Sequence, residues 1–137
     1  MKNGFDIVTD VRTLINVDIV NSLITGKIYP FVRPAGRDRL IDIVIGLLNS
    51  DNEQTQEADV NIRLHAPSIK VVINESEQYV PDYATFTSLT DILTSLLDEQ
   101  YRETFFTEVD IPGDIIQDTD GTFFCLIRVT YRSIQDN

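Results

Sequence analysis

Residues 105–134 read FFTEVDIPGDIIQDTDGTFFCLIRVTYRSI, and this segment combines a turn signal with a strand pattern. Its Asp120-Gly121 dipeptide is a strong signal for a two-residue hairpin turn, because such turns need residues that accept positive φ angles. After the turn, apolar and polar residues alternate, as in a strand with one buried face. The predicted buried face carries Phe123, Cys125, Ile127, Val129 and Tyr131. We therefore predict a long C-terminal β-hairpin, with a bulge or bend at Pro112-Gly113.

Further strands are predicted before this hairpin. Lys27–Val32 (KIYPFV) is a short strand, and Pro30 places it at the edge or end of a sheet because proline cannot donate to a strand ladder. Leu40–Leu48 has apolar residues at every second position, and Val60–His65 alternates apolar with polar residues. Ser68–Ile73 would extend the same sheet as one more short strand.

Amphipathic helices flank the strands. Residues 5–25 repeat apolar residues at three- and four-residue spacing, with a break near residue 16, which predicts a helix and a shorter one that stops at Gly26. After a polar connection over 74–80, a second amphipathic helix runs from about Pro81 to about Tyr101. Its expected buried face carries Phe86, Leu89, Leu93, Leu96 and Leu97.

Together these elements predict one α+β domain over residues 1–137, in the order α(α)-β-β-β-α-β-β. An antiparallel sheet of about five strands is packed by two amphipathic helices, which must cover its apolar face. A chain of 137 residues buries roughly two-thirds of its unfolded surface on folding. That is enough for a core without disulfides or metals.

Composition restricts the class of protein. Cys125 is the only cysteine, so an intrachain disulfide is impossible. We expect neither a signal peptide nor a membrane span, because no apolar run approaches the ~20 residues that a bilayer requires. The net charge of −11 argues against general nucleic-acid binding, which needs a basic face. An acidic wall would still tolerate DNA nearby, and the charge also serves solubility alone.

We find no pattern that predicts a catalyst, a cofactor or a metal site. His65 is the only histidine and lies on the predicted polar face of a strand, where we interpret it as a surface or rim residue. Cys125 lies mid-strand among apolar residues, where burial makes a thiol inert. Asp118–Gly121 (DTDG) lacks the spacing of a calcium loop, and a hairpin turn already explains it.

Two charged segments are not explained by folding alone. The turn over 33–39 holds three of the chain's eight arginines, and arginine favours bidentate contact with carboxylates. The loop over 49–59 carries only acidic charges, and 108–120 is acidic as well. The simpler interpretations are a solvated turn, in which Arg37 or Arg39 pairs locally with Asp38, and a disordered loop. The candidate interface residues are Arg33, Arg37, Arg39, Asp51, Glu53, Glu57, Asp110 and Asp114.

The first forty residues carry a resemblance to a known family. Leu14–Asp18 (LINVD), followed by Leu23–Pro30 (LITGKIYP), resembles the opening of the tail-completion, or tail-terminator, proteins of long-tailed bacteriophages and prophages. Members of that family begin with a helix and a short second helix. A glycine, a basic residue and Ile-Tyr-Pro then lead into the first strand. The motif covers about residues 11–30, and the later order of elements fits. The loop at 49–57 and the Pro112-Gly113 bend match nothing in the family pattern.

The resemblance implies a structural role without a fixed catalytic set. Such proteins form a ring, usually a hexamer, at the head-proximal end of the tail tube. The ring stops tube growth and docks to the head connector, and DNA passes through its lumen as cargo. Partners would be other copies of the chain, the tail-tube protein and the connector protein. The expected location is the host bacterial cytoplasm during assembly and the virion tail afterwards.

Two other functions compete with this interpretation. A small acidic regulatory or inhibitory protein could mimic nucleic acid, but that requires carboxylates spaced like phosphates on one face. The acids here are spread over helices, loops and hairpin. A ligand-binding or enzymatic α+β domain is the third alternative, and the chain lacks the clustered polar groups and glycines that such a site needs.

Overall fold

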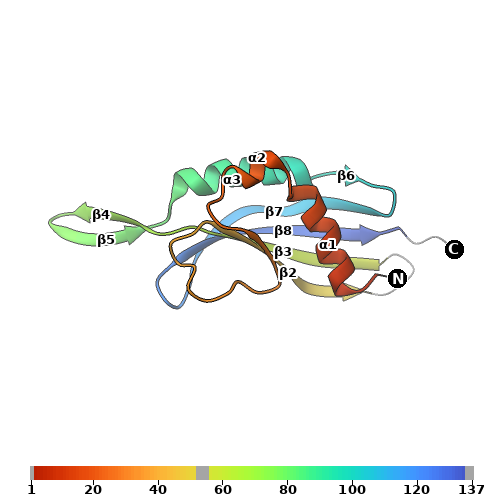
Figure 1. The fold of residues 1–137 in the computed structure, drawn as a ribbon, viewed down its shortest axis with the longest axis horizontal. Coiled ribbons are helices and arrows are strands. Elements are labelled where there is room, and N and C mark those ends of the chain that lie inside the picture. Colours follow the sequence, from red (N-terminus) through yellow and green to blue (C-terminus); the bar gives the residue numbers. More distant parts are fainter. Residues whose placement is uncertain (1, 52–55, 135–137) are drawn as a thin grey trace.

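The computed structural model describes the backbone of residues 2–51 and 56–134, and the side chains of 2–48 and 56–134. A curved six-stranded sheet in the order β1-β2-β3-β8-β7-β6 forms the body, and a separate two-stranded sheet, β4-β5, projects from it (Figure 1). The elements are α1 (Gly4–Ile15), α2 (Asp18–Asn21), β1 (Ile28–Pro30), β2 (Asp42–Asp51), β3 (Gln56–His65), β4 (Ile69–Ile73), β5 (Ser76–Val80), α3 (Tyr83–Leu97), β6 (Gln100–Tyr101), β7 (Phe105–Gln117) and β8 (Phe123–Ser133).

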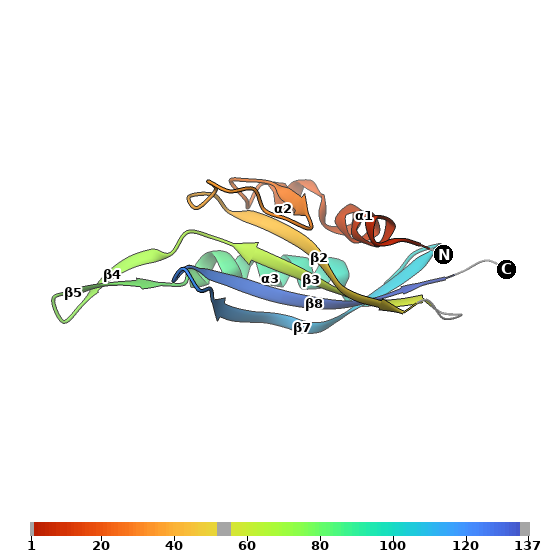
Figure 2. The ribbon, with the colours of Figure 1, turned by 90° about the horizontal axis from the view of Figure 1, so that it is seen from below.

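Alternation along the strands builds the core. In β3 every second residue is buried, and its partners in β8 follow the same pattern because the two strands pair without a register shift. The buried apolar side chains of the strands are Ile28, Ile43, Val44, Ile45, Ala58, Val60, Ile62, Leu64, Phe105, Cys125, Ile127, Val129 and Tyr131. Helix α1 packs on the β2 side of the sheet and α3 on the β7 side (Figure 2).

Both long helices begin at side-chain caps. Asn3 caps α1 through a capping box, in which its side chain accepts from the Asp6 N–H and the Asp6 carboxylate accepts from the Asn3 N–H. Asp82 caps α3 by accepting from the Thr85 N–H. The buried stripes are Ile7, Val8, Val11, Leu14 and Ile15 in α1, and Phe86, Leu89, Leu93 and Leu97 in α3.

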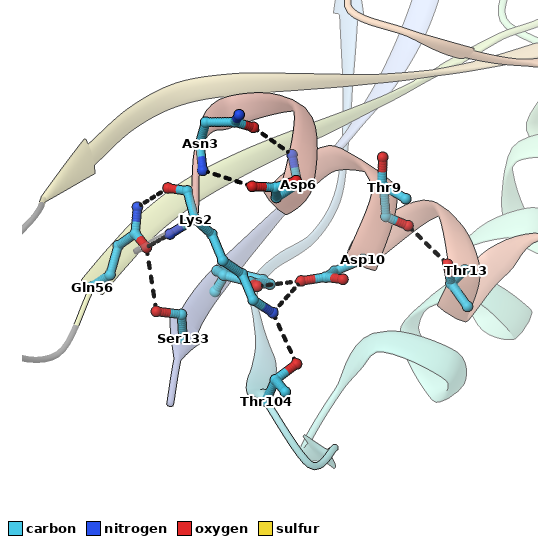
Figure 3. Close-up of polar contacts among 10 residues, drawn as sticks. Lys2, Asn3, Asp6, Thr9, Asp10, Thr13, Gln56, Thr104 and Ser133 are labelled. Carbon is cyan, nitrogen blue, oxygen red and sulfur yellow. Dashed lines mark hydrogen bonds and ion pairs between the residues drawn. The ribbon is translucent and has the colours of Figure 1, made fainter. Parts of the chain in front are cut away.

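A polar cluster ties the N-terminus to the ends of β3 and β8 (Figure 3). The Lys2 ammonium donates to Asp10 at 2.6 Å and to Thr104 at 2.9 Å, and the Lys2 N–H donates to the Gln56 side chain at 2.9 Å. The Tyr131 hydroxyl also donates to Asp10. These bonds satisfy polar groups that the core would otherwise leave unpaired.

The predicted class is confirmed, because the chain is α+β with a mostly antiparallel sheet. The C-terminal hairpin forms, and β7 shifts its register on β8 around Pro112-Gly113. The predicted two-residue turn at Asp120-Gly121 is wrong, because residues 118–122 connect the last strand pair, Gln117 with Phe123. Gly121 lies in this connection with a φ of 85°. The edge strand β1 is also present, although it pairs parallel with β2 rather than antiparallel.

Three other details of the prediction are wrong. The main sheet has six strands rather than about five, since β6 begins where the second helix was expected to continue. Residues 68–73 do not extend that sheet, because β4 pairs only with β5. The segment 76–80, predicted as a polar connection, is itself a strand. The observed order is therefore α-α-β-β-β-β-β-α-β-β-β.

The β4–β5 hairpin, which we call the arm (residues 69–80), stands out from the body at the end opposite to both termini (Figures 1 and 2). Its turn uses Asn74 and Glu75, with φ angles of 52° and 66°. Two consecutive positive φ angles are the mark of the turn that suits a two-residue hairpin, and asparagine tolerates that conformation well.

Candidate interaction surface

One face of the arm is uncharged and largely aliphatic. The register pairs Ile69 with Val80, Val71 with Gln78 and Ile73 with Ser76, so these six side chains share a face. Ile69 is 43% exposed and Ile73 is 46% exposed. Isolated two-stranded hairpins are marginally stable in water, since they bury little apolar surface. An exposed aliphatic face on such a hairpin is therefore a candidate interaction surface.

The opposite face of the arm is mixed. It carries Lys70, Val72, Glu77 and Tyr79, and the Lys70 ammonium lies 2.9 Å from the Glu77 carboxylate. Both partners of this ion pair are more than half exposed, so the pair contributes little to stability. Val72 and Tyr79 are 68% and 62% exposed. The two faces of the arm thus differ in charge although both are open to solvent.

The arginine turn is built around a buried carboxylate that the sequence interpretation missed. Asp42, at the start of β2, is fully buried and accepts from Arg33 Nε at 2.9 Å. It also accepts from Arg37 Nε at 2.8 Å, Arg37 Nη2 at 2.9 Å and the Lys27 N–H at 2.8 Å. Burial alone raises the pKa of Asp42, but the bonds from Arg37, Lys27 and Arg33 outweigh it and lower the pKa to about 2.

Neighbouring backbone completes this cluster. Arg33 Nη2 donates to the carbonyls of Arg37 and Leu40, which fixes the loop between β1 and β2. The chain needs glycine at residue 26, since a Cβ there would lie 1.8 Å from Asp42 Oδ1. The cluster is thus a structural clamp, in which one carboxylate holds two guanidinium groups and a backbone N–H.

This arrangement changes how the predicted arginines are interpreted. Arg33 and Arg37 are engaged within the chain, as in the local-pair alternative, but with Asp42 in place of Asp38. Arg39 is exposed. That these arginines contact another subunit stays a prediction. A lone aspartate at the start of an isoleucine-rich strand, close in sequence to three arginines, was the signal that could have identified the clamp.

The predicted acidic residues do not converge on one site. Glu57 pairs with Arg132 at 3.1 Å on the solvent face of the sheet. Asp110 accepts a hydrogen bond from the Thr130 hydroxyl, and Asp114 is exposed on β7. Glu53 and the side chain of Asp51 lie outside the described residues.

A polar pocket lies between the loop after β1, the end of β3 and the β7–β8 turn. His65, Ser68, Asp118 and Asp120 line it, and the His65 Nε2 and Ser68 Oγ atoms are buried with no hydrogen-bond partner in the described chain. Burial lowers the pKa of His65 to about 4, so the imidazole is neutral at physiological pH. His65 is therefore a half-buried residue that lines this pocket together with Ser68.

Cys125 lies in the core, where burial raises the pKa of its thiol to about 11. Within the described ranges, histidine, cysteine and acidic side chains form no group of three that could hold a metal ion. No helix in those ranges is long and apolar enough to cross a membrane. No protein-family model and no curated protein sequence matches this chain.

Proposed function

We propose that this chain is a non-enzymatic structural subunit of a phage or prophage virion, of the tail-completion type. It forms a ring, most simply a hexamer, at the head-proximal end of the tail tube. The ring terminates the tail and joins it to the head connector. The observation that carries the proposal is the uncharged face of the arm, where Ile69 and Ile73 are exposed and Val71 and Val80 are only partly buried.

The shape of the molecule supports assembly by unlike surfaces. The arm lies at one end and the termini at the other (Figure 1). A cyclic head-to-tail ring joins a patch on one copy to a different patch on the next. A projecting arm supplies the first patch, and the body of the next copy supplies the second.

The charge of the chain suits a conduit for DNA. With 22 acidic and 11 basic residues, a ring of this chain carries a large net negative charge. Of its arginines, Arg33 and Arg37 are tied to Asp42 and Arg132 to Glu57. An acidic surface repels phosphate groups, so DNA passing through the lumen would not be held.

The proposal is tested on tail tubes assembled from the tube protein of the same genome. Purified chain is added, and tube ends are viewed by negative-stain electron microscopy while tube length is followed over time. We expect a ring on one end of each tube and an arrest of elongation. The variant Ile69→Ser with Ile73→Ser should lose both effects, since it removes the aliphatic face of the arm.

Val72→Ser is the matched control, because Val72 is an exposed aliphatic residue on the opposite face of the same hairpin. Circular dichroism should show that all variants keep the wild-type fold. Wild-type chain that leaves both tube ends bare and growing would refute the proposed function. A double variant that caps tubes like the wild type would remove the observation on which it rests.

A further inference from the structure

The sheet has a free edge that could receive another strand. Strand β6 pairs with β7 only at Phe106 and Thr107, so the rest of β7 has no strand on its outer side among the described residues. From Asp114 to Gln117 the strand is regular and pairs residue by residue with β8. Its side chains are exposed here, with Ile115 at 41% and Ile116 at 37%. Unpaired strand edges are templates for pairing with another chain.

A cavity of about 270 Å³ opens beside this edge, between β7 and α3. Phe86, Thr90, Pro112, Ile115 and Cys125 are among its lining residues. Gly113 keeps the strand close to the helix: its φ is 154°, and a Cβ there would lie 3.0 Å from Thr90 Cγ2. The helix side of this hollow also carries Thr87, Asp91 and Thr94, so its lining is part apolar and part polar. The edge therefore offers backbone hydrogen-bonding groups next to a hollow of mixed polarity.

The two faces of the edge match the two faces of the arm. Ile115 pairs with the buried Cys125, which places it on the helix side of the sheet, whereas Asp114 pairs with Leu126 and lies on the opposite side. On the arm, the aliphatic face with Ile73 lies opposite to the face with Lys70. In one orientation of the docked arm, its aliphatic face therefore lies on the side of Ile115, and Lys70 lies on the side of Asp114.

The charges of the two surfaces are complementary. Lys70 is the only base of the arm, in residues 69–80. Asp114 forms no ion pair within the described chain. Lys70 can leave its exposed partner Glu77 at little cost. The arm has one base and two acids, so its net charge is only −1. An acidic neighbouring copy therefore repels the arm less than it would repel a strongly acidic segment of the chain.

We propose that the arm of one copy docks on β7 of the next copy. There β4 extends the sheet along Asp114–Gln117, the aliphatic face of the arm covers the hollow beside α3, and Lys70 faces Asp114. The inference rests on the proposed ring and identifies the two surfaces that close it. It is a case of strand addition, in which backbone bonds give affinity and side chains give specificity.

A second exposed apolar patch competes as the receiving surface. Phe5 packs edge-on against Phe31 at 5.4 Å, and Phe5 and Val32 are each 71% exposed. The adjoining strand β1 has only three residues and ends in Pro30, so it offers little edge for pairing. The β7 edge is longer and carries the complementary charge, which favours it.

A charge exchange tests the contact. Lys70→Glu and Asp114→Lys are prepared singly and together, and assembly with tail tubes is measured by light scattering over a range of concentrations. Each single variant should raise the concentration for half-assembly about tenfold, the effect of losing one cross-strand charge pair and gaining a repulsion. The double variant should return to within about threefold of the wild type.

Mixing the two single variants gives a second reading. In a ring where the variants alternate, every interface joins either the two reversed charges or the two native charges, so each interface pairs an acid with a base. An equimolar mixture should therefore assemble like the wild type, whereas each variant alone does not. Lys27→Glu and Glu103→Lys are controls for charge reversal at exposed positions of the body and should change assembly less than about threefold.

The outcomes separate the docking contact from the proposed function. If the wild type forms rings but the single variants assemble equally well, or the double variant is not restored, the contact is wrong and the ring stands. If Val32→Ser weakens assembly and Asp114→Lys does not, the arm docks on the β1 edge and the proposal is overturned. If the wild type forms no ring on any tube, the proposed function fails and the contact with it.

Discussion

Replacing Asp42, the first residue of β2, by asparagine should destabilise the fold more than any single change in the turn that precedes it. The carboxylate is fully buried and accepts four hydrogen bonds, three of them from Arg33 and Arg37. An asparagine amide group would place N–H donors against guanidinium donors. Two arginine charges would then lie without their counter-ion.

Removing one partner of a buried ion pair costs about 3–5 kcal/mol. The Arg33 and Arg37 side chains remain 20% and 19% exposed, so water can partly solvate the orphaned charges. We therefore expect a loss near the lower limit, about 3 kcal/mol, in the free energy of unfolding at pH 7. For a domain of this size, that equals a fall of roughly 10 °C in Tm.

The effect has a defined pH dependence. The folded-state pKa of Asp42 is about 2, lower than its ordinary value of 3.8. A depressed carboxyl pKa stabilises the fold above pH ~4, and this contribution, roughly 2 kcal/mol, disappears as the pH falls from about 4 to about 2. The difference in stability between wild type and Asp42→Asn should therefore shrink across that window.

Urea unfolding followed by circular dichroism, at several pH values from about 7 to about 2, measures this difference. Asp38→Asn is the control, since Asp38 is exposed in the same turn and should change stability by less than about 0.5 kcal/mol. An Asp42→Asn variant within about 1 kcal/mol of the wild type at neutral pH would refute the clamp. So would a larger loss in acid than at neutral pH.

Three further changes test the packing around the clamp and the core. Gly26→Ala should lower the free energy of unfolding by at least about 2 kcal/mol in thermal unfolding, because its Cβ would overlap Asp42. Gly46→Ala is the control and should cost no more than about 1 kcal/mol, since the atom nearest to its Cβ lies at 3.9 Å. Equal effects of the two changes would contradict the close approach of residue 26 to Asp42. Cys125 should resist a thiol reagent at pH ~8 in the native protein and react in urea, because burial suppresses its thiolate; rapid native labelling would place it elsewhere. Thr107→Val should cost about 1 kcal/mol in urea unfolding, because the buried Thr107 hydroxyl donates to the last carbonyl of α3 at 2.7 Å; an unchanged midpoint would show that this bond is dispensable.

Periodicity and turn signals were enough to predict the α+β class and both long helices. The alternation over 123–131 and the apolar stripe of the helix after Pro81 are local patterns that survive folding, and both elements form. The alternation of apolar and polar residues does not show whether neighbouring strands run parallel or antiparallel, so the parallel pairing of β1 with β2 was missed. Strand β5 (SEQYV) was missed because it buries almost nothing: local pairing with β4 through the Asn74-Glu75 turn holds it, with no core face to produce a pattern.

The interaction surfaces depended on tertiary contacts that a sequence does not reveal. The sequence indicated that the arginines of the turn bind a carboxylate. It did not indicate that Asp42 is that carboxylate, because this depends on how residues 33–37 fold against Gly26 and Asp42. The aliphatic residues of the arm were interpreted as one more strand of the sheet. Only the three-dimensional arrangement leaves them without a core to cover.

We propose that this chain closes into a ring through its arm. Native mass spectrometry of the wild type and of the variant Ile69→Ser with Ile73→Ser, each released from tube ends or concentrated in solution, measures the number of copies directly. We expect one closed oligomer, a hexamer, for the wild type and monomers for the variant. A variant that gives the same oligomer as the wild type, or a wild type that is monomeric throughout, would contradict it.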